Sequence, residues 1–212
     1  MPIEITIIFS LIVLLFSVII HELSHGTVAL ALGDQTAKYA GRLTLNPIAH
    51  LDLFGSVIFP LMLVFFASIT GQGLIFGWAK PVPINPNNFK NPRWDSVKVA
   101  LAGPLSNILL AVFFGLLIRF LPLPLPLLYL FSIIVIMNFL LALFNLLPIP
   151  PLDGSHLLFS ILPDRFWKLK VIMSQYGFFI LIFLIFFLGG IQLVSFGALF
   201  LYVLTTGQLP IF

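Results

Sequence analysis

The sequence predicts an all-α polytopic membrane protein with about five to six transmembrane helices, a small membrane-associated β-hairpin and a re-entrant segment. Two observations predict this fold. Of the 212 residues, 60% are hydrophobic and only 8% are charged, whereas a soluble domain carries about 25% charged residues. Several apolar runs also approach or exceed the roughly 20 residues that a helix needs to cross a bilayer.

The expected elements follow from these runs. One run, 54–69, contains Pro60, and the Gly- and Pro-rich stretch after it cannot form a regular helix. Residues 37–45 alternate in places and are broken by Gly41, which indicates a short hairpin near the membrane surface. The remaining apolar runs are expected to be membrane helices, the last of them short or tilted: 5–32, 95–120, 127–147, 175–188 and 191–204.

Composition also excludes several classes of site and partner. The net charge of +3 reports membrane orientation in a protein of this kind, so we expect a lipid bilayer around the chain and no nucleic acid. With no cysteine in the sequence, disulfides and thiolate metal sites are excluded. A metal ion would have to be bound by the four histidines and the seven acidic residues.

The first apolar run contains the sequence His21-Glu22-Leu23-Ser24-His25. Residues four apart share one face of a helix, so both imidazoles can reach a single ion. Glu22 lies about 100° round the axis, where it can contact a water on that ion and act as a general base, as in zincins. Ionisable groups inside a membrane are costly and usually functional. The alternative is a polar cluster that holds neighbouring helices together by hydrogen bonds.

A third ligand is needed, because catalytic zinc usually has three protein ligands and one open position. Asp153 is the best candidate. It follows the apolar run 127–147 across three prolines that prevent the helix from continuing. Broken backbone of this kind is tolerated at membrane depth where it lines a cavity. The alternative is that Asp153 caps the next helix. We interpret His50 and His156 as structural or interfacial residues.

These motifs resemble the site-2 protease family of intramembrane metalloproteases, in its compact form without PDZ or CBS domains. The resemblance implies zinc ligands at His21, His25 and Asp153, with Glu22 as the base. It also implies a substrate-facing role for Asn145. The motifs that carry it are HELSHG (21–26), LNPIAHLDLFGS (45–56), GWAKPVPINP (77–86), ALAGPLSN (100–107) and NLLPIPPLDGSHLL (145–158).

Several further expectations follow from this reading. The chain is expected to be one domain of residues 1–212, with a catalytic core at about 5–160 and C-terminal helices at about 173–206. It is expected to bind one Zn²⁺ and to cleave single-span membrane proteins or signal-peptide remnants, by regulated intramembrane proteolysis. A partner protein is possible but not named by the sequence. Asn107 is a second candidate for substrate binding, and it can also bond across to a neighbouring helix. The alternative function is a membrane zinc-binding or transport protein without peptidase activity.

Chain direction limits the topology. If every apolar run crossed the membrane, His25 and Asp153 would lie on opposite sides and could not share an ion. We therefore expect residues 54–83 to enter the membrane and return to the same side. That topology puts nine of the ten Lys and Arg residues on one side and leaves Arg119 on the other. By the positive-inside rule, the N-terminus is then external and the active site lies nearer the cytoplasmic face of the cell membrane.

Overall fold

The computed structural model describes residues 2–52, 58, 62 and 80–211. Among these residues, four helices are long and apolar enough to cross a membrane, and a shorter apolar helix, α8 (Gly190–Thr206), follows them. The predicted run 54–69 lies largely outside the described residues, so the count of five to six spans is reduced to four long helices and α8. The four long helices are α1 (Ile3–Ala31), α4 (Pro92–Phe120), α5 (Leu125–Asn145) and α7 (Trp167–Phe187).

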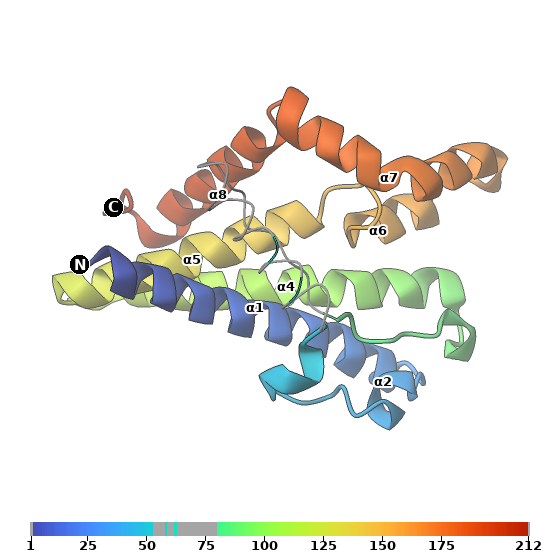
Figure 1. The fold of residues 1–212 in the computed structure, drawn as a ribbon, viewed down its shortest axis with the longest axis horizontal. Helices are drawn as coiled ribbons and strands as arrows, with labels where there is room; N and C mark the ends of the chain where they lie inside the picture. Colours follow the sequence, from blue (N-terminus) through green and yellow to red (C-terminus); the bar gives the residue numbers. More distant parts are fainter. Residues whose placement is uncertain (1, 53–57, 59–61, 63–79, 212) are drawn as a thin grey trace.

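Helices α1, α4 and α5 lie side by side, with α4 running opposite to the other two (Figure 1). The late α1 residue His25 contacts Val99 near the start of α4. At the far end of the layer, the early α1 residue Thr6 accepts a hydrogen bond from Tyr129 near the start of α5. Because α1 and α5 run in the same direction, their C-terminal ends lie on the same side, as a metal site shared by His25 and Asp153 requires.

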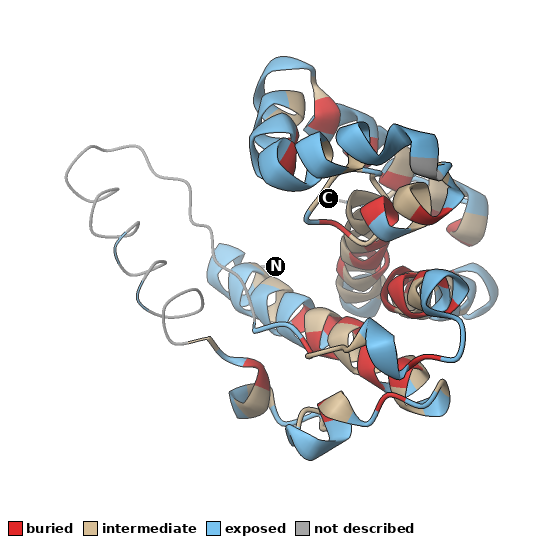
Figure 2. Cartoon of the chain, turned by 90° about the vertical axis from the view of Figure 1, so that its right-hand side faces the viewer, coloured by how far each residue is buried: buried red, intermediate tan, exposed pale blue. Residues whose placement is uncertain are grey.

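A second packing layer joins α8 to α4 and α5. Tyr202 of α8 is completely buried, and its hydroxyl lies 2.7 Å from the hydroxyl of Ser132. The outer helix faces remain exposed and apolar (Figure 2), for example at Leu109, which exposes 69% of its surface. Such faces suit lipid rather than water. The buried cluster between these helices consists of Ala111, Ile118, Val135, Phe139, Ala198 and Tyr202.

The predicted β-hairpin at 37–45 is wrong. Those residues begin within a single helical turn, α2 (Thr36–Tyr39), and no strand occurs among the residues that the structure describes. The cause is local. The carboxylate of Asp34 accepts hydrogen bonds from the backbone N–H and the hydroxyl of Thr36, and such bonds favour the start of a helical turn. The alternation in the sequence was too short to outweigh this contact.

Asp34 also joins the two ends of the connection between α1 and α4. Its carboxylate accepts bonds from the Asn85 backbone N–H at 2.7 Å and from the Asn88 amide at 2.7 Å. Burial by itself would raise the pKa of Asp34, but these bonds and those from Thr36 outweigh it and hold the pKa below its ordinary value. The chain therefore leaves α1 and returns toward α4 at one end of the layer. The predicted re-entrant segment at 54–83 lies mostly outside the described residues.

The remaining described elements are short. They surround the same end of the helix layer, at which α1 and α5 end and α4 begins. They are the 3₁₀ turns η1 (Pro47–His50), η3 (Pro86–Asn88) and η4 (Asp164–Phe166), and the helix α6 (Gly154–Ile161).

Candidate metal centre

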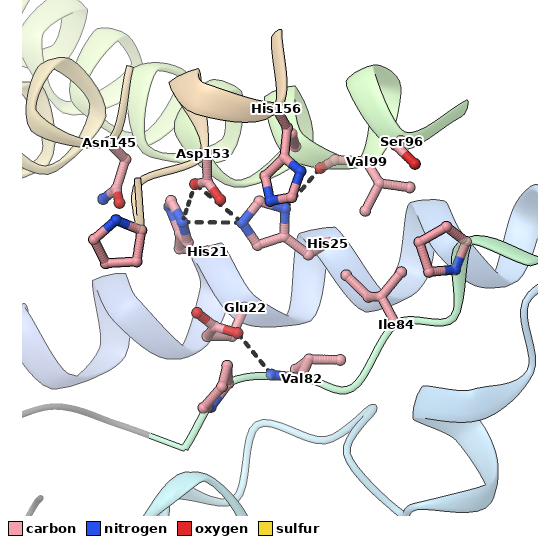
Figure 3. Close-up of a pocket in the computed structure, with 14 residues that line it drawn as sticks. His21, Glu22, His25, Val82, Ile84, Ser96, Val99, Asn145, Asp153 and His156 are labelled. Atoms are coloured by element: carbon pink, nitrogen blue, oxygen red, sulfur yellow. Dashed lines mark hydrogen bonds and ion pairs between the residues drawn. The ribbon is translucent and has the colours of Figure 1, made fainter. Parts of the chain in front are cut away.

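His21, His25 and Asp153 meet where α1, α4 and the start of α6 come together (Figure 3). The Nε2 atoms of the two histidines lie 3.1 Å apart. The Oδ2 atom of Asp153 lies 3.0 Å from Nε2 of His21 and 3.3 Å from Nε2 of His25. Both histidines are buried, each with 6% of its surface exposed. The three residues that were predicted as ligands are thus brought together within the described structure.

This spacing fits a tetrahedral zinc site. Zinc bonds of about 2.0–2.1 Å place neighbouring ligand atoms about 3.3–3.4 Å apart, and the three observed distances lie at or just below that value. Two neutral imidazole nitrogens and one carboxylate are also ligands that zinc commonly takes. A three-residue set leaves the fourth position for water or substrate, which is the arrangement of a catalytic rather than a structural site.

Asn107 sets the tautomer of His21. The Asn107 amide donates to Oδ1 of Asn138 at 2.9 Å and to the carbonyl of Ser17 at 3.3 Å. Its own Oδ1 must therefore accept the 2.7 Å hydrogen bond from Nδ1 of His21. Asn138 in turn donates to the carbonyl of Ile134. With the proton held on Nδ1, the Nε2 lone pair of His21 points at the metal position, as ligating histidines require.

The backbone of α4 does the same for His25. Nδ1 of His25 lies 2.6 Å from the carbonyl oxygen of Val99, an acceptor that leaves Nε2 unprotonated. The Nε2 atoms of both histidines and Oδ2 of Asp153 are then three acceptors that face one another with no proton between them. Only a cation makes that arrangement favourable in a buried site. The donor set therefore argues for a metal ion on the structure's own chemistry.

Gly103 makes room for the two imidazoles. A methyl group at this position of α4 would overlap Nε2 of both His21 and His25. The backbone of α4 can approach the ligands this closely because residue 103 has no side chain. The Gly103-Pro104 pair, expected to permit a close helix approach, is thus placed directly against the metal centre.

Asp153 reaches the site because the chain turns sharply after α5. It precedes the first residue of α6, yet its side chain makes no capping hydrogen bond. The alternative that Asp153 serves as a helix cap is therefore wrong for this structure. The next residue, Gly154, lies so close to the carbonyls of Leu146 and Leu147 that a Cβ atom would collide with both. This close packing holds the turn and directs Asp153 toward the histidines.

Glu22 lies on the neighbouring face of α1 and does not join the ligand set. Its Oε2 accepts a 2.8 Å hydrogen bond from the backbone N–H of Val82 (Figure 3). Val82 stands between Pro81 and Pro83, so it supplies the only backbone N–H of those three residues. Sequence reasoning did not find this contact, although an N–H flanked by two prolines was visible in the sequence.

A cavity of about 420 Å³ contains the ligands and Glu22. Asn145, at the end of α5, lines it as the resemblance implied, while its amide donates to the carbonyl of Leu141 at 2.9 Å. His156 also lines the cavity, although it was interpreted as structural or interfacial. Asn107 does not line it. Its side chain is fully buried behind His21, so it contacts a ligand where substrate contact was expected.

Comparison with known proteins identifies the family. The model of peptidase family M50 matches residues 9–124 and 124–188 of the chain. The chain belongs to peptidase family M50, the site-2 protease family. The resemblance seen in its motifs is thereby confirmed, and the chain is a zinc metallopeptidase with several membrane-spanning helices.

Similar proteins come from bacteria and archaea. "Putative zinc metalloprotease YwhC" of Bacillus subtilis is 41% identical over 185 residues, which are 83% of this chain and 78% of that protein. "Putative zinc metalloprotease MJ0611" of Methanocaldococcus jannaschii is 38% identical over 66% of this chain and 63% of its own length. "Putative zinc metalloprotease Rip2" of Mycolicibacterium smegmatis is 30% identical over 81% and 64%, respectively. No solved structure matches this chain.

Proposed function

We propose that this M50 peptidase is an intramembrane endopeptidase, which hydrolyses peptide bonds within or near the transmembrane segments of membrane-anchored proteins. The observation that carries the proposal is the place of the metal ligands along α1. His21 lies about 27 Å of helix rise from Ile3 and about 15 Å from Ala31. Since the hydrocarbon layer is about 30 Å thick, a helix that spans it holds His21 inside the membrane rather than in a soluble domain.

The protein residues have separate roles in this reaction. His21, His25 and Asp153 hold one zinc ion per chain, which when bound supplies a Lewis acid for the peptide carbonyl and an activated water. Glu22 accepts a proton from that water and passes it to the leaving amine. The hydrogen bond from Val82 to Oε2 keeps the Glu22 carboxylate at the edge of the cavity. It leaves Oε1 to take the proton.

Substrate binding requires a freed backbone, because a helix satisfies its own N–H and C=O groups. A transmembrane substrate must therefore unwind where it meets the zinc. The Asn145 amide already donates within α5, so its carbonyl oxygen is the group that can accept a hydrogen bond from the unwound segment. We assign Asn107 to the positioning of His21, in place of the substrate contact expected from the sequence.

The orientation follows from the distribution of basic residues. Arg119 lies at the opposite end of α4 from the metal centre, where it donates to the carbonyl of Leu204. The basic residues of the connections that flank α1, α4 and α7 lie toward the metal-centre end of the helix layer. The positive-inside rule then puts the metal centre nearer the cytoplasmic face and the N-terminus outside.

The substrates of this activity are single-span membrane proteins or signal-peptide remnants, which makes regulated intramembrane proteolysis the physiological setting. The catalytic core of about 5–160 carries every residue invoked here, and selection of substrates falls to the membrane portion or to a partner protein. A zinc-binding or transport protein would not need Glu22, because an acid beside the ligand set adds nothing to simple binding.

Cleavage-site mapping tests this proposal. The full chain is reconstituted with zinc into lipid vesicles together with a tagged single-span protein, and the products are analysed by mass spectrometry. We expect cleavage inside the transmembrane segment or within a few residues of its end. Cleavage confined to distant soluble loops, or vesicle uptake of zinc without any cleavage, would overturn the proposal, and the second result would favour transport.

A further inference from the structure

A second cavity opens beside the metal centre. Its volume is about 410 Å³, and it is formed where the start of α4 and the start of α7 meet α6. Two of its lining residues, Ser96 and His156, also line the cavity that contains the zinc ligands. The two cavities therefore form one continuous cleft, which leads from the metal position to the basic end of the helix layer (Figure 3).

The lining of this second cavity is basic. Arg93, Lys170 and His156 contribute to it, and none of its lining residues is acidic. The cavity also has an apolar wall, because Phe159 and Pro92 line it. A site with two permanent positive charges, an imidazole and apolar carbon suits a carboxylate carried on a short aliphatic stem.

Arg93 is held in place before any ligand arrives. Its Nε donates to the carbonyl of Ser160 at 2.6 Å, and the Ser160 hydroxyl donates back to the carbonyl of Arg93 at 3.2 Å. This reciprocal pair ties the start of α4 to the end of α6. Within the described part of the chain, the hydrogen bonds of the Arg93 guanidinium involve Nε alone, so its terminal nitrogens remain for an incoming anion. Such preorganisation lowers the entropic cost of binding.

We propose that the second cavity is a substrate subsite that takes an acidic side chain, Asp or Glu, a few residues from the scissile peptide bond. The proposal rests on the proposed endopeptidase function. His156 lies three residues after the ligand Asp153 and reaches both cavities. An extended peptide advances about 3.3 Å per residue, so two to four residues bridge the zinc position and the second cavity.

Continuity of the cleft favours a substrate side chain over a lipid headgroup. A lipid phosphate would need only an interfacial basic patch, whereas this cavity shares two walls with the catalytic one. A peptide that passes the zinc on its way to the surface enters the second cavity without leaving protein contact. Selection of substrates by charge near the cleavage site follows from this path.

The test compares matched substrates and matched variants of the reconstituted full chain. One single-span substrate is made with Asp, Asn or Lys at each of five positions on either side of its cleavage site. At one or two positions on one side, we expect replacement of Asp by Asn to lower kcat/KM by about three- to tenfold, the effect of one partly exposed ion pair. Lys170→Gln should remove this preference, and Lys170→Glu should reverse it in favour of Lys.

Lys168→Gln is the matched control, because Lys168 lies two residues away on the same helix and stacks on Trp167 outside the cavity. It should keep the preference for Asp. Equal cleavage of the Asp, Asn and Lys substrates by the unaltered chain would overturn the subsite and leave the protease standing. A loss in Lys170→Gln that is the same for every substrate and depends on anionic lipid would assign the cavity to a headgroup instead.

Binding separates failure of the subsite from failure of the proposed function. The zinc-loaded Glu22→Gln variant is titrated with the Asp and Asn substrates in uncharged detergent, and affinity is followed by fluorescence anisotropy. Tighter binding of the Asp substrate, lost in the double variant with Lys170→Gln, supports the subsite even if no cleavage is seen. Equal affinity for both substrates overturns it.

Discussion

Oδ1 of Asn107 lies 2.7 Å from Nδ1 of His21, and this hydrogen bond determines which nitrogen of the imidazole is available to zinc. The orientation of Asn107 is itself fixed by its bonds to Asn138 and Ser17. A chain of three side chains from three helices thus prepares one metal ligand. Partners of this kind orient a ligand and raise its basicity.

Asn107→Ala is therefore expected to weaken zinc binding by about ten- to a hundredfold, since the His21 ring loses the acceptor that holds its proton on Nδ1. Zinc affinity is measured by competition with a chelator of known affinity. Asn138→Ala, one step further from the metal, should have a smaller effect. Unchanged affinity in Asn107→Ala would contradict the role assigned to this residue.

Gly103→Ala should lower zinc occupancy more severely. The added methyl group overlaps Nε2 of both histidine ligands, and the α4 backbone cannot move away without separating from α1. Metal content per chain, measured by atomic emission, gives the result. Gly197→Ala in α8 is the control, because the added methyl would meet only the flexible tip of Leu143 at 3.1 Å. Full zinc occupancy in Gly103→Ala would show that α4 does not pack against the ligands in this way.

The Val82 N–H holds Glu22, and proline is the substitution that removes it. Val82→Pro is expected to lower kcat by about tenfold or more, which corresponds to the loss of one hydrogen bond to a charged group. Zinc content should stay near that of the unaltered chain. Val82→Ala keeps the N–H and serves as the control for lost packing. If both variants lose the same activity, the hydrogen bond has no part in the reaction.

Asp34 predicts a dependence of stability on pH. Because its folded-state pKa is below the ordinary value, its stabilising effect is fully present above about pH 4 and is lost as pH falls through the folded-state pKa. Tm in detergent, followed by tryptophan fluorescence, should be higher for the unaltered chain than for Asp34→Asn at pH 7. The difference should shrink below about pH 4.

Glu4→Gln provides the control, since Glu4 is exposed near the start of α1. Its Tm should follow that of the unaltered chain across the whole pH range. A gap between the unaltered chain and Asp34→Asn that stays constant down to pH 3 would mean that the carboxylate of Asp34 is not what the four hydrogen bonds stabilise.

The metal ligands could be predicted from the sequence because their chemistry is local. The spacing of His21 and His25 sets both on one helix face, and the prolines before Asp153 require a turn at the end of a membrane helix. The four long helices were also predictable, since an apolar run of sufficient length has few alternatives in a membrane. Their observed bounds lie within three residues of the predicted ones, except for α7, which begins at Trp167 rather than near residue 175.

The contacts around the ligands could not be predicted, because they depend on how the helices pack. Asn107 and Asn138 are 31 residues apart, and their hydrogen bond exists only once α4 and α5 lie together. For that reason Asn107 was expected to face substrate. The hairpin at 37–45 failed differently: a weak alternation was read as a strand, while the capping contact of Asp34 with Thr36 was overlooked.

The central claim is that zinc held by His21, His25 and Asp153 works with Glu22 to cleave a membrane substrate. Its most direct test measures zinc content and cleavage of one single-span substrate together, for the unaltered full chain and for Glu22→Gln. The account predicts about one zinc per chain in both proteins and cleavage by the unaltered chain alone. Undiminished cleavage by a zinc-loaded Glu22→Gln, or an active chain that holds no zinc, would contradict it.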